Sequence, residues 1–295
     1  TDEVVCISKV THEILEAVAP EVPSYYLPHA VNSSEFRKYK TPEEKAAVAQ
    51  LRERVTVEQA APPLKNKNKT LFFWNNRNAR RKQSGTLVWW FKEWLDKRGH
   101  DKATLLMHTD ARDPHGQDLP HLIEKLEVNQ GQVFLSTNKV NASELAAMYN
   151  AADYTINISD AEGFGLSTLE SLACGTPIIV NMTGGLQEQV TNGRDWFGWG
   201  IKPSSKAVIG SLQVPYIYED RISQADFEKT LDSALNVSKK AYKKMSVQGI
   251  NHVVENYNFE KFERQWVTLM DDIVTRHGSW ETRKGYKRWH LMEVA

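Results

Sequence analysis

The stretch that decides the fold is Glu162-Gly-Phe-Gly-Leu-Ser-Thr-Leu-Glu170, in which two glutamates flank a Gly-x-Gly turn. A strand-like apolar run, 154–158, precedes this stretch, and a helical pattern leading to a second short strand, 178–180, follows it. The sequence therefore predicts a strand, a tight loop and a helix in succession. The first N–H groups of such a helix are unpaired and, together with the helix dipole, favour an anion such as a phosphate.

The spacing of the two glutamates argues against a shared proton. If the helix begins near Gly165, Glu170 lies about 7–8 Å along it, at 1.5 Å per residue. Gly163 and Gly165 allow the backbone to approach a ligand closely. The pattern therefore favours an extended ligand between the two carboxylates, Glu162 at one end and Glu170 at the other, with its phosphates in the loop.

Strand and helix patterns alternate over the middle of the chain. The expected strands are 71–74, 103–108, 133–135, 154–158 and 178–180, and the expected helices are 85–98, 119–126 and 141–151. This alternation predicts an α/β fold with a Rossmann-like, doubly wound parallel sheet that is covered on both faces. Ligands bind such sheets at the carboxyl ends of the strands, so Arg77, Ser136 and Glu162, which all follow strands, should lie on one rim.

The flanking segments follow other patterns. We expect a strand at 4–8, a helix at 10–18, a strand and turn at 25–32, a helix opening at Thr41, and helices at 224–235, 239–255 and 259–275. The aromatic segments 196–200 and 214–219 are interpreted as a surface insertion that breaks the alternation.

Composition excludes several classes of function. The chain has 295 residues with 37 basic and 37 acidic side chains, so a strong non-specific attraction to nucleic acid is not expected. No run approaches the ~18 apolar residues of a membrane span, and no signal-peptide pattern opens the chain. Cys6 and Cys174 lie far apart in the sequence, which favours a reducing compartment and a cytoplasmic location.

The paired glutamates resemble the E-G-F-G-x-x-x-x-E motif of retaining GT-B glycosyltransferases of family 4, the glycosyl transferases group 1. That motif is followed by A-x-G-x-P, which here reads Ala173-Cys-Gly-Thr-Pro177. The similarity covers most of 1–275 and includes Gln132 to Ser136, Ser143-Glu-Leu, Tyr149 to Asp153, Gly184-Gly185, Glu188 and the basic loop from Asn76 to Lys82.

The resemblance implies transfer of a hexose from a nucleotide diphosphate sugar to an acceptor hydroxyl, with retention, without a cofactor and without a metal. It implies that Glu162 contacts the transferred sugar and that Glu170 holds the ribose hydroxyls. The remaining donor-binding residues that it implies are Gly163, Phe164, Gly165, Leu166, Ser167 and Ser136.

The resemblance also places Arg77 and Lys82 on the donor diphosphate. Cations fixed next to a departing nucleoside diphosphate stabilise the charge that develops there. The run Arg80-Arg81-Lys82 leaves the register open by a few residues, so Arg80 or Arg81 can fill this role instead.

By resemblance, residues 1–35 are the end of an N-terminal GT-B domain with its linker, 36–275 are the donor-binding domain, and 276–295 are a tail. About a hundred or more preceding residues are then expected, either in a longer chain or in a partner chain, and 1–295 alone should be inactive. The acceptor, a glycan, lipid or protein, stays open. Residues 1–32, with no sheet of their own, should expose apolar side chains, namely Val4, Val5, Ile7, Ile14 and Leu15.

Other functions stay open beside this one. The chain can be a non-catalytic nucleotide-sugar-binding module, or a GT-B enzyme of different chemistry such as an epimerase or phosphorylase. A nicotinamide enzyme fits poorly, because the glycine fingerprint lacks its third Gly. Asp110-Ala-Arg-Asp113 is not the metal-holding D-x-D of the other glycosyltransferase fold. The basic and aromatic tail fits a membrane surface or, better, a helix docking on the missing domain.

Overall fold

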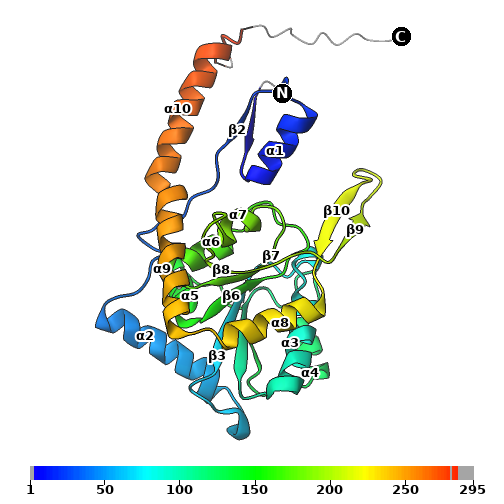
Figure 1. The fold of residues 1–295 in the computed structure, drawn as a ribbon, viewed down its shortest axis with the longest axis vertical. Helices are drawn as coiled ribbons and strands as arrows, with labels where there is room; N and C mark the ends of the chain where they lie inside the picture. The colour runs from blue at the N-terminus through cyan, green and yellow to red at the C-terminus, as the bar shows by residue number, and fades with distance from the viewer. Residues whose placement is uncertain (1–2, 280, 285–295) are drawn as a thin grey trace.

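The computed structural model describes residues 3–279 and 281–284 and is built around one six-stranded parallel sheet (Figure 1). Its strands are β3 Thr70–Asn75, β4 Ala103–His108, β5 Val133–Ser136, β6 Tyr154–Asn157, β7 Ile178–Asn181 and β8 Gly198–Ile201. Their spatial order is β5-β4-β3-β6-β7-β8, and each neighbouring pair is parallel. The chain therefore proceeds outward from β3 in one direction and from β6 in the other. The carboxyl ends of β3 and β6 form the switch point at which such sheets bind ligands.

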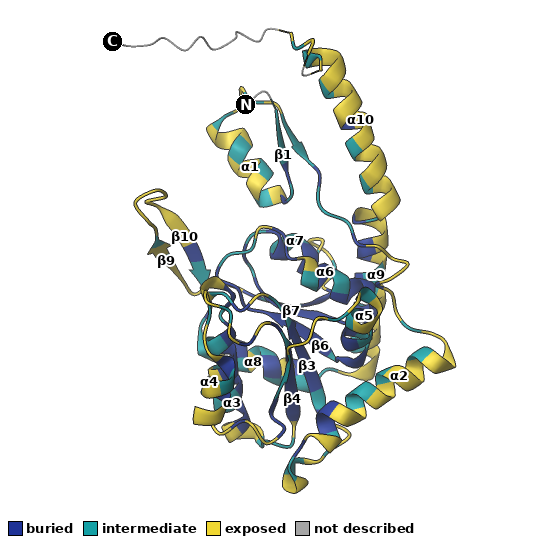
Figure 2. Cartoon of the chain, turned by 180° about the vertical axis from the view of Figure 1, so that it is seen from behind, coloured by how far each residue is buried: buried dark blue, intermediate teal, exposed yellow. Residues whose placement is uncertain are grey.

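Helices cover both faces of this sheet, and the alternation of side chains along β3 shows why. Phe72 and Trp74 point into the cluster beneath α3 Ser84–Arg98, α4 Leu119–Lys125 and α8 Gln224–Leu235. Leu71 and Phe73 point to the opposite cluster, beneath α5 Ala142–Ala151, α6 Leu166–Ala173, α7 Leu186–Val190 and α9 Lys239–Asn256. The strands appear as the buried centre of the body in Figure 2. The predicted doubly wound α/β fold is thus confirmed.

The prediction that 196–200 belongs to a surface insertion is wrong. Segment 196–200 overlaps β8, which continues the alternation because it follows α7 and pairs with β7. Phe197 and Ile201 are buried, and a Cβ atom at Gly198 would lie 1.8 Å from the carbonyl oxygen of Ile178. Glycine at that position lets the edge strand approach β7, and its lack of a side chain hides the strand pattern.

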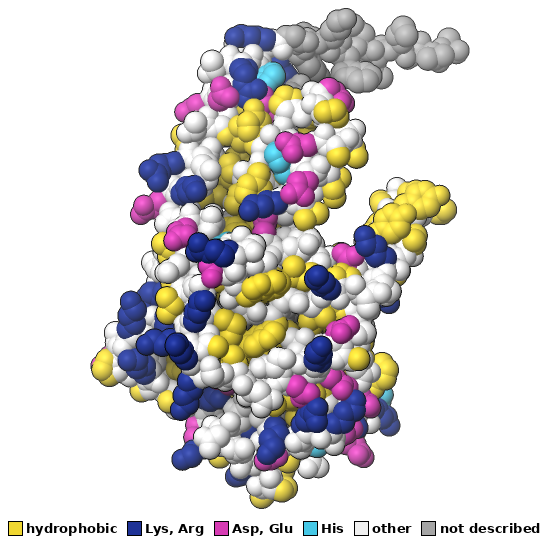
Figure 3. All heavy atoms as spheres, viewed as in Figure 1, with side chains coloured by type: hydrophobic (Ala, Val, Ile, Leu, Met, Phe, Trp, Pro, Cys, Tyr) yellow, Lys and Arg dark blue, Asp and Glu magenta, His cyan; other side chains and the backbone are white. Residues whose placement is uncertain are grey.

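The other part of the insertion is confirmed as a surface feature. Strands β9 Ser205–Ile209 and β10 Ile217–Arg221 pair antiparallel and form a hairpin that projects from the body (Figure 1). Its turn is apolar and open to solvent, since Leu212 is 98% exposed and Tyr216 is 76% exposed. Apolar side chains gather at its tip in Figure 3.

Residues 4–26 form a small unit of their own. Strands β1 Val4–Cys6 and β2 Ser24–Tyr26 pair in parallel and are joined by α1 Lys9–Val18. The expectation that this segment has no sheet is therefore wrong. Pairing of β1 with β2 leaves Val4, Val5, Ile7 and Leu15 half-buried, and of the five expected apolar residues only Ile14 is exposed.

This N-terminal unit is attached to the rest of the chain at two places. The backbone N–H of Lys9 and the hydroxyl of Tyr26 donate to the two carboxylate oxygens of Glu188 in α7, at 3.0 and 3.2 Å. The carboxylate of Glu3 accepts hydrogen bonds from Arg276, at 3.0 Å, and from His277, at 2.7 Å. Both residues belong to the long helix α10 Phe259–His277, which passes beside the unit in Figure 1.

The remaining elements lie between these parts. Helix α2 Pro42–Glu53 begins with a capping box of Thr41 and Glu44, and it continues into a π-helical turn, Arg54–Glu58. Short 3₁₀ turns occupy Pro62–Leu64 and Arg80–Lys82. No helix within 3–279 and 281–284 is both long and apolar enough to span a bilayer. The end of the tail that was expected to bind a membrane or another domain, 285–295 together with Trp280, lies outside the described residues.

Candidate active site

The loop that joins β6 to α6 depends on two glycines. Gly165 precedes α6 with φ +94°, and a Cβ atom there would lie 2.6 Å from a methyl group of Leu186. Gly184 has φ +48°, and its Cβ atom would lie 1.7 Å from the carbonyl oxygen of Glu162. Among the residues that the structure describes, no side chain caps the start of α6, which leaves the backbone N–H groups there available to a ligand.

Glu162 lies at this loop among cations. Its carboxylate forms an ion pair with the ammonium group of Lys82, and the side chains of both residues are about one-tenth exposed. The guanidinium of Arg81 is 4.0 Å from the same carboxylate and donates to the carbonyl oxygen of Ala161 at 2.6 Å. Asn157, at the end of β6, donates to it at 3.5 Å. Burial lowers the pKa of Lys82, and the neighbouring carboxylate opposes that effect.

Glu170 lies further along α6 in the opposite kind of surroundings. Its carboxylate accepts a hydrogen bond of 2.7 Å from the hydroxyl of Tyr149 in α5. That hydroxyl in turn accepts a hydrogen bond of 2.9 Å from the side-chain amide of Asn75, at the end of β3. Burial raises the pKa of Glu170 to about 7, and the hydrogen bond from Tyr149 offsets only part of that rise.

The four basic side chains of the loop after β3 have three destinations. Lys82 turns inward to Glu162, and Arg81 lies against the same loop. Arg77 binds Asp113 at 2.7 Å, and Arg80 binds the buried carboxylate of Glu219 at 2.6 Å. Lys82 therefore lies at the switch point, whereas Arg77 and Arg80 are directed to other carboxylates.

Two asparagines near this loop were assigned no role from the sequence. Asn76 precedes Arg77, and its buried side-chain nitrogen has no hydrogen-bond partner among the described residues. Asn157 ends β6 and reaches Glu162. Both are polar residues that directly follow or end a buried strand, which is the one sequence signal that distinguishes them.

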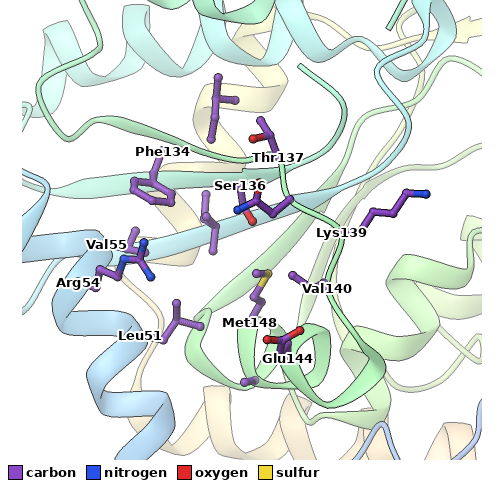
Figure 4. Close-up of a pocket in the computed structure, with 14 residues that line it drawn as sticks. Leu51, Arg54, Val55, Phe134, Ser136, Thr137, Lys139, Val140, Glu144 and Met148 are labelled. Atoms are coloured by element: carbon purple, nitrogen blue, oxygen red, sulfur yellow. The ribbon is translucent and has the colours of Figure 1, made fainter. Parts of the chain in front are cut away.

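Ser136 ends β5, at the far end of the same rim. Three strand spacings of about 4.8 Å separate β5 from β6, so these two strands lie roughly 14 Å apart across the sheet. The hydroxyl of Ser136 is 3.0 Å from Nδ1 of His108. Beside it opens a pocket of about 490 Å³, shown in Figure 4, which is lined by side chains that include Arg54, Phe134 and Met148.

Metal ligands do not cluster in the part of the chain that the structure describes. No group of three or more His, Cys, Asp or Glu side chains lies close enough there to hold an ion.

The chain belongs to the glycosyl transferases group 1 family, whose model matches residues 58–234. Among relatives, it is 28% identical over 180 residues to the alpha-monoglucosyldiacylglycerol synthase of Streptococcus pneumoniae, which is 61% of this chain and 37% of that protein. It is 46% identical over 87 residues to a D-inositol 3-phosphate glycosyltransferase of Arthrobacter sp., which is 30% of this chain and 20% of that protein. The chain thus spans well under half the length of these relatives.

Solved structures show the same fold. Sucrose-phosphate synthase from Thermosynechococcus elongatus superposes with a TM-score of 0.70 at 20% identity, covering 94% of this chain and 59% of that one. HepE of Anabaena, solved in complex with UDP-glucose, superposes with a TM-score of 0.68 at 13% identity, covering 92% and 64%. The fold is that of the GT-B glycosyltransferases.

Proposed function

We propose that this chain carries the donor site of a glycosyltransferase that moves a hexose from a nucleotide diphosphate sugar to an acceptor hydroxyl. The observation that carries this proposal is the meeting of Lys82 and Glu162 at the switch point between β3 and β6. One loop supplies a cation for phosphate, and the other supplies a carboxylate for sugar. HepE was solved with UDP-glucose, which supports a donor of this class.

The chemistry follows from the charges on the two loops. When the bond between the anomeric carbon and the diphosphate breaks, negative charge develops on the phosphate and positive charge on the sugar. Lys82, with Arg81 beside it, stabilises the first charge, and Glu162 stabilises the second. Because these side chains neutralise the leaving group, the transfer needs no metal ion.

Configuration at the anomeric carbon is retained in this proposal. Glu162 is engaged by Lys82, Arg81 and Asn157, so we assign it a stabilising role and not that of a nucleophile. The leaving phosphate then accepts the proton of the acceptor hydroxyl, whose oxygen forms the new bond to the anomeric carbon on the same face of the sugar. Arg77 and Arg80 contact the diphosphate only if they exchange Asp113 and Glu219 for it.

The remainder of the donor extends along the rim. The carboxylate of Glu170 accepts the ribose hydroxyls, and the pocket beside Ser136 receives the base. Backbone N–H groups from Phe164 to Ser167 meet the sugar or a phosphate. The acceptor is bound by the part of the enzyme that this chain does not supply, either in a longer chain or in a partner chain.

Both cysteines are free and buried, which supports a reducing, cytoplasmic location.

Ligand-induced stabilisation tests this function directly. UDP, GDP and ADP, each with and without a hexose, are added to the 295-residue chain in the presence of EDTA, and its thermal unfolding is followed. At a hundred times its dissociation constant, the correct nucleotide should add roughly 2.7 kcal/mol to the free energy of unfolding. Absence of any shift would contradict the donor site. Stabilisation only with added Mg²⁺ would contradict the metal-independent transfer.

A second assay separates an enzyme from a binding module. We expect sugar transfer only when the chain is joined to, or mixed with, the acceptor-binding half. Nucleotide binding without transfer in that combination would indicate a non-catalytic module. Transfer by the 295-residue chain alone would show that it contains an acceptor site.

A further inference from the structure

We propose that Tyr149 is a positioning residue, whose hydroxyl holds the carboxylate of Glu170 in the orientation and charge state that bind a ribose diol. The inference rests on the proposed function, which assigns the ribose to Glu170. It adds a residue to which neither the family motif nor the charged loops assign a role.

The direction of the hydrogen bonds is fixed by chemistry. The side-chain nitrogen of Asn75 can only donate, and it donates to the hydroxyl of Tyr149 at 2.9 Å. The hydroxyl proton is therefore free to point at Glu170, whose Oε2 atom lies 2.7 Å away. Asn75 thus orients Tyr149, and Tyr149 orients Glu170.

The ring of Tyr149 is held rigidly by packing. Its residue is fully buried, and its ring meets those of Phe73 and Phe36 edge-on, with centroids 5.0 and 6.2 Å away. Its carbonyl oxygen accepts a hydrogen bond of 2.7 Å from Thr176. A buried aromatic ring that is packed on several sides cannot move with the carboxylate. The carboxylate of Glu170 therefore keeps this hydrogen bond only in the position that the fixed hydroxyl allows.

Within the described residues, Tyr149 supplies the only hydrogen bond to the carboxylate of Glu170. With Oε2 occupied, Oε1 remains to accept from a ligand. A ribose offers two adjacent hydroxyl donors, and its diol can bridge Oε1 and the outer lone pair of Oε2. The geometry therefore selects for a diol and against a deoxy sugar.

Few groups other than this hydroxyl influence the ionisation of Glu170. Cys174 lies one turn further along α6, and burial raises the pKa of its thiol. Arg37 lies near Cys174 and acts on that thiol. Tyr149 is thus the principal group that favours the ionised form of Glu170, whose pKa burial raises to about 7. Loss of the hydroxyl should raise the pKa of Glu170 further and leave less carboxylate at neutral pH.

The test uses Tyr149→Phe, which removes the hydroxyl and keeps the ring. We expect its dissociation constant for the nucleotide that binds best to rise about tenfold at pH 7, because a hydrogen bond to a charged group is worth at least that factor. The midpoint of binding against pH should move upward by about one unit. For the corresponding 2′,3′-dideoxy nucleotide, the wild-type and variant proteins should bind equally.

Tyr154→Phe is the matched control. Tyr154 is also buried, and its hydroxyl donates to the carbonyl oxygen of Ala234 at 2.9 Å, away from the site. This variant can lose stability but should keep the wild-type affinity and pH midpoint. In a Glu170→Gln background, Tyr149→Phe should have no further effect on affinity, because the group that it orients no longer ionises.

Each outcome separates the two proposals. If the wild-type protein binds no nucleotide, the proposed function fails. If it binds and discriminates against the dideoxy nucleotide, but Tyr149→Phe keeps the wild-type affinity and pH midpoint, the role of Tyr149 is overturned and the donor site stands. If Tyr149→Phe does not fold, Asn75→Ala decides: a two- to threefold loss with an upward pH midpoint supports the proposal, and wild-type behaviour overturns it.

Discussion

The loop that leads into α6 and the body of that helix each carry one glutamate, and the electrostatic surroundings of the two glutamates are opposite. Glu162 is compensated by two cations and an amide. Glu170, eight residues later, has a neutral hydroxyl as its partner, and burial raises its pKa to about 7. The difference teaches that the spacing of two carboxylates sets where they lie, whereas their neighbours set what they can do. One is suited to a sugar that gains positive charge, and the other to neutral hydroxyl donors.

Removal of Lys82 is the strongest way to break this comparison. Lys82→Ala leaves Glu162 almost buried, with the guanidinium of Arg81 at 4.0 Å as the one remaining cation beside it among the described residues and the amide of Asn157 at 3.5 Å. Breaking a buried ion pair from one side typically costs 3–5 kcal/mol, so we expect a loss of about 4 kcal/mol in the free energy of unfolding, measured by urea denaturation. Lys92→Ala, which removes an exposed pair with Asp96, is the control and should cost less than about 0.5 kcal/mol. Equal effects would show that Glu162 does not depend on Lys82.

The stability of the protein against pH sharpens the comparison at Glu170. Its pKa rises from an ordinary 4.5 to about 7 in the folded chain, because burial disfavours the charged form. The stability that this group contributes is therefore complete below about pH 4.5 and is lost as the pH rises through 7. A shift of this size corresponds to at most about 3 kcal/mol. Glu170→Gln should remove this part of the pH dependence in urea titrations between pH 4.5 and 8.5. An unchanged profile in Glu170→Gln would contradict the burial of a titrating carboxylate.

Ligand binding should separate the two glutamates by about tenfold in affinity, or about 1.4 kcal/mol. Glu170→Ala should weaken the binding of the free nucleotide and of the nucleotide sugar alike, because both contain the ribose. Glu162→Ala should leave the affinity for the free nucleotide unchanged and abolish the preference for the sugar-bearing donor. Calorimetric titration of both variants with both ligands measures this difference. Equal losses for the bare nucleotide would show that the roles are wrongly assigned.

Arg81 gives the smallest effect and tests whether the compensation of Glu162 is shared. Its guanidinium is about half exposed and lies 4.0 Å from the carboxylate, a geometry that contributes little in water. Arg81→Ala should cost at most about 1 kcal/mol of stability, as measured by urea denaturation. A cost matching that of Lys82→Ala would mean that both cations hold Glu162 equally.

Much of the fold was predictable because its signals are local. The strand before Glu162, the tight turn and the helix after it were all predicted from the apolar run and the glycines. The strand, helix and strand of the N-terminal unit were expected at 4–8, 10–18 and 25–32, but the pairing of the two strands was missed because it joins Val4 to Ser24, twenty residues away. Segment 196–200 was misassigned because glycine replaces the apolar side chains that usually mark a strand.

The site was predictable in position but not in partners. The sequence left four basic residues open, and the 3₁₀ turn at 80–82 decides which of them turns inward to Glu162. Tyr149 lies in a segment that resembles the family, but the sequence assigned it no role. Its contact with Glu170 exists only because α5 and α6 pack side by side. Contacts between distant helices of this kind require the three-dimensional structure.

The two attachments of the N-terminal unit have a consequence for a chain that is cut. Glu188 holds the unit through Lys9 and Tyr26, and Arg276 and His277 hold it through Glu3. The segment 33–35 is exposed, so a protease has access to it. Cleavage there would sever the covalent link but leave every one of these contacts in place. The two pieces should therefore co-elute in size-exclusion chromatography and separate only when a denaturant breaks the contacts between them.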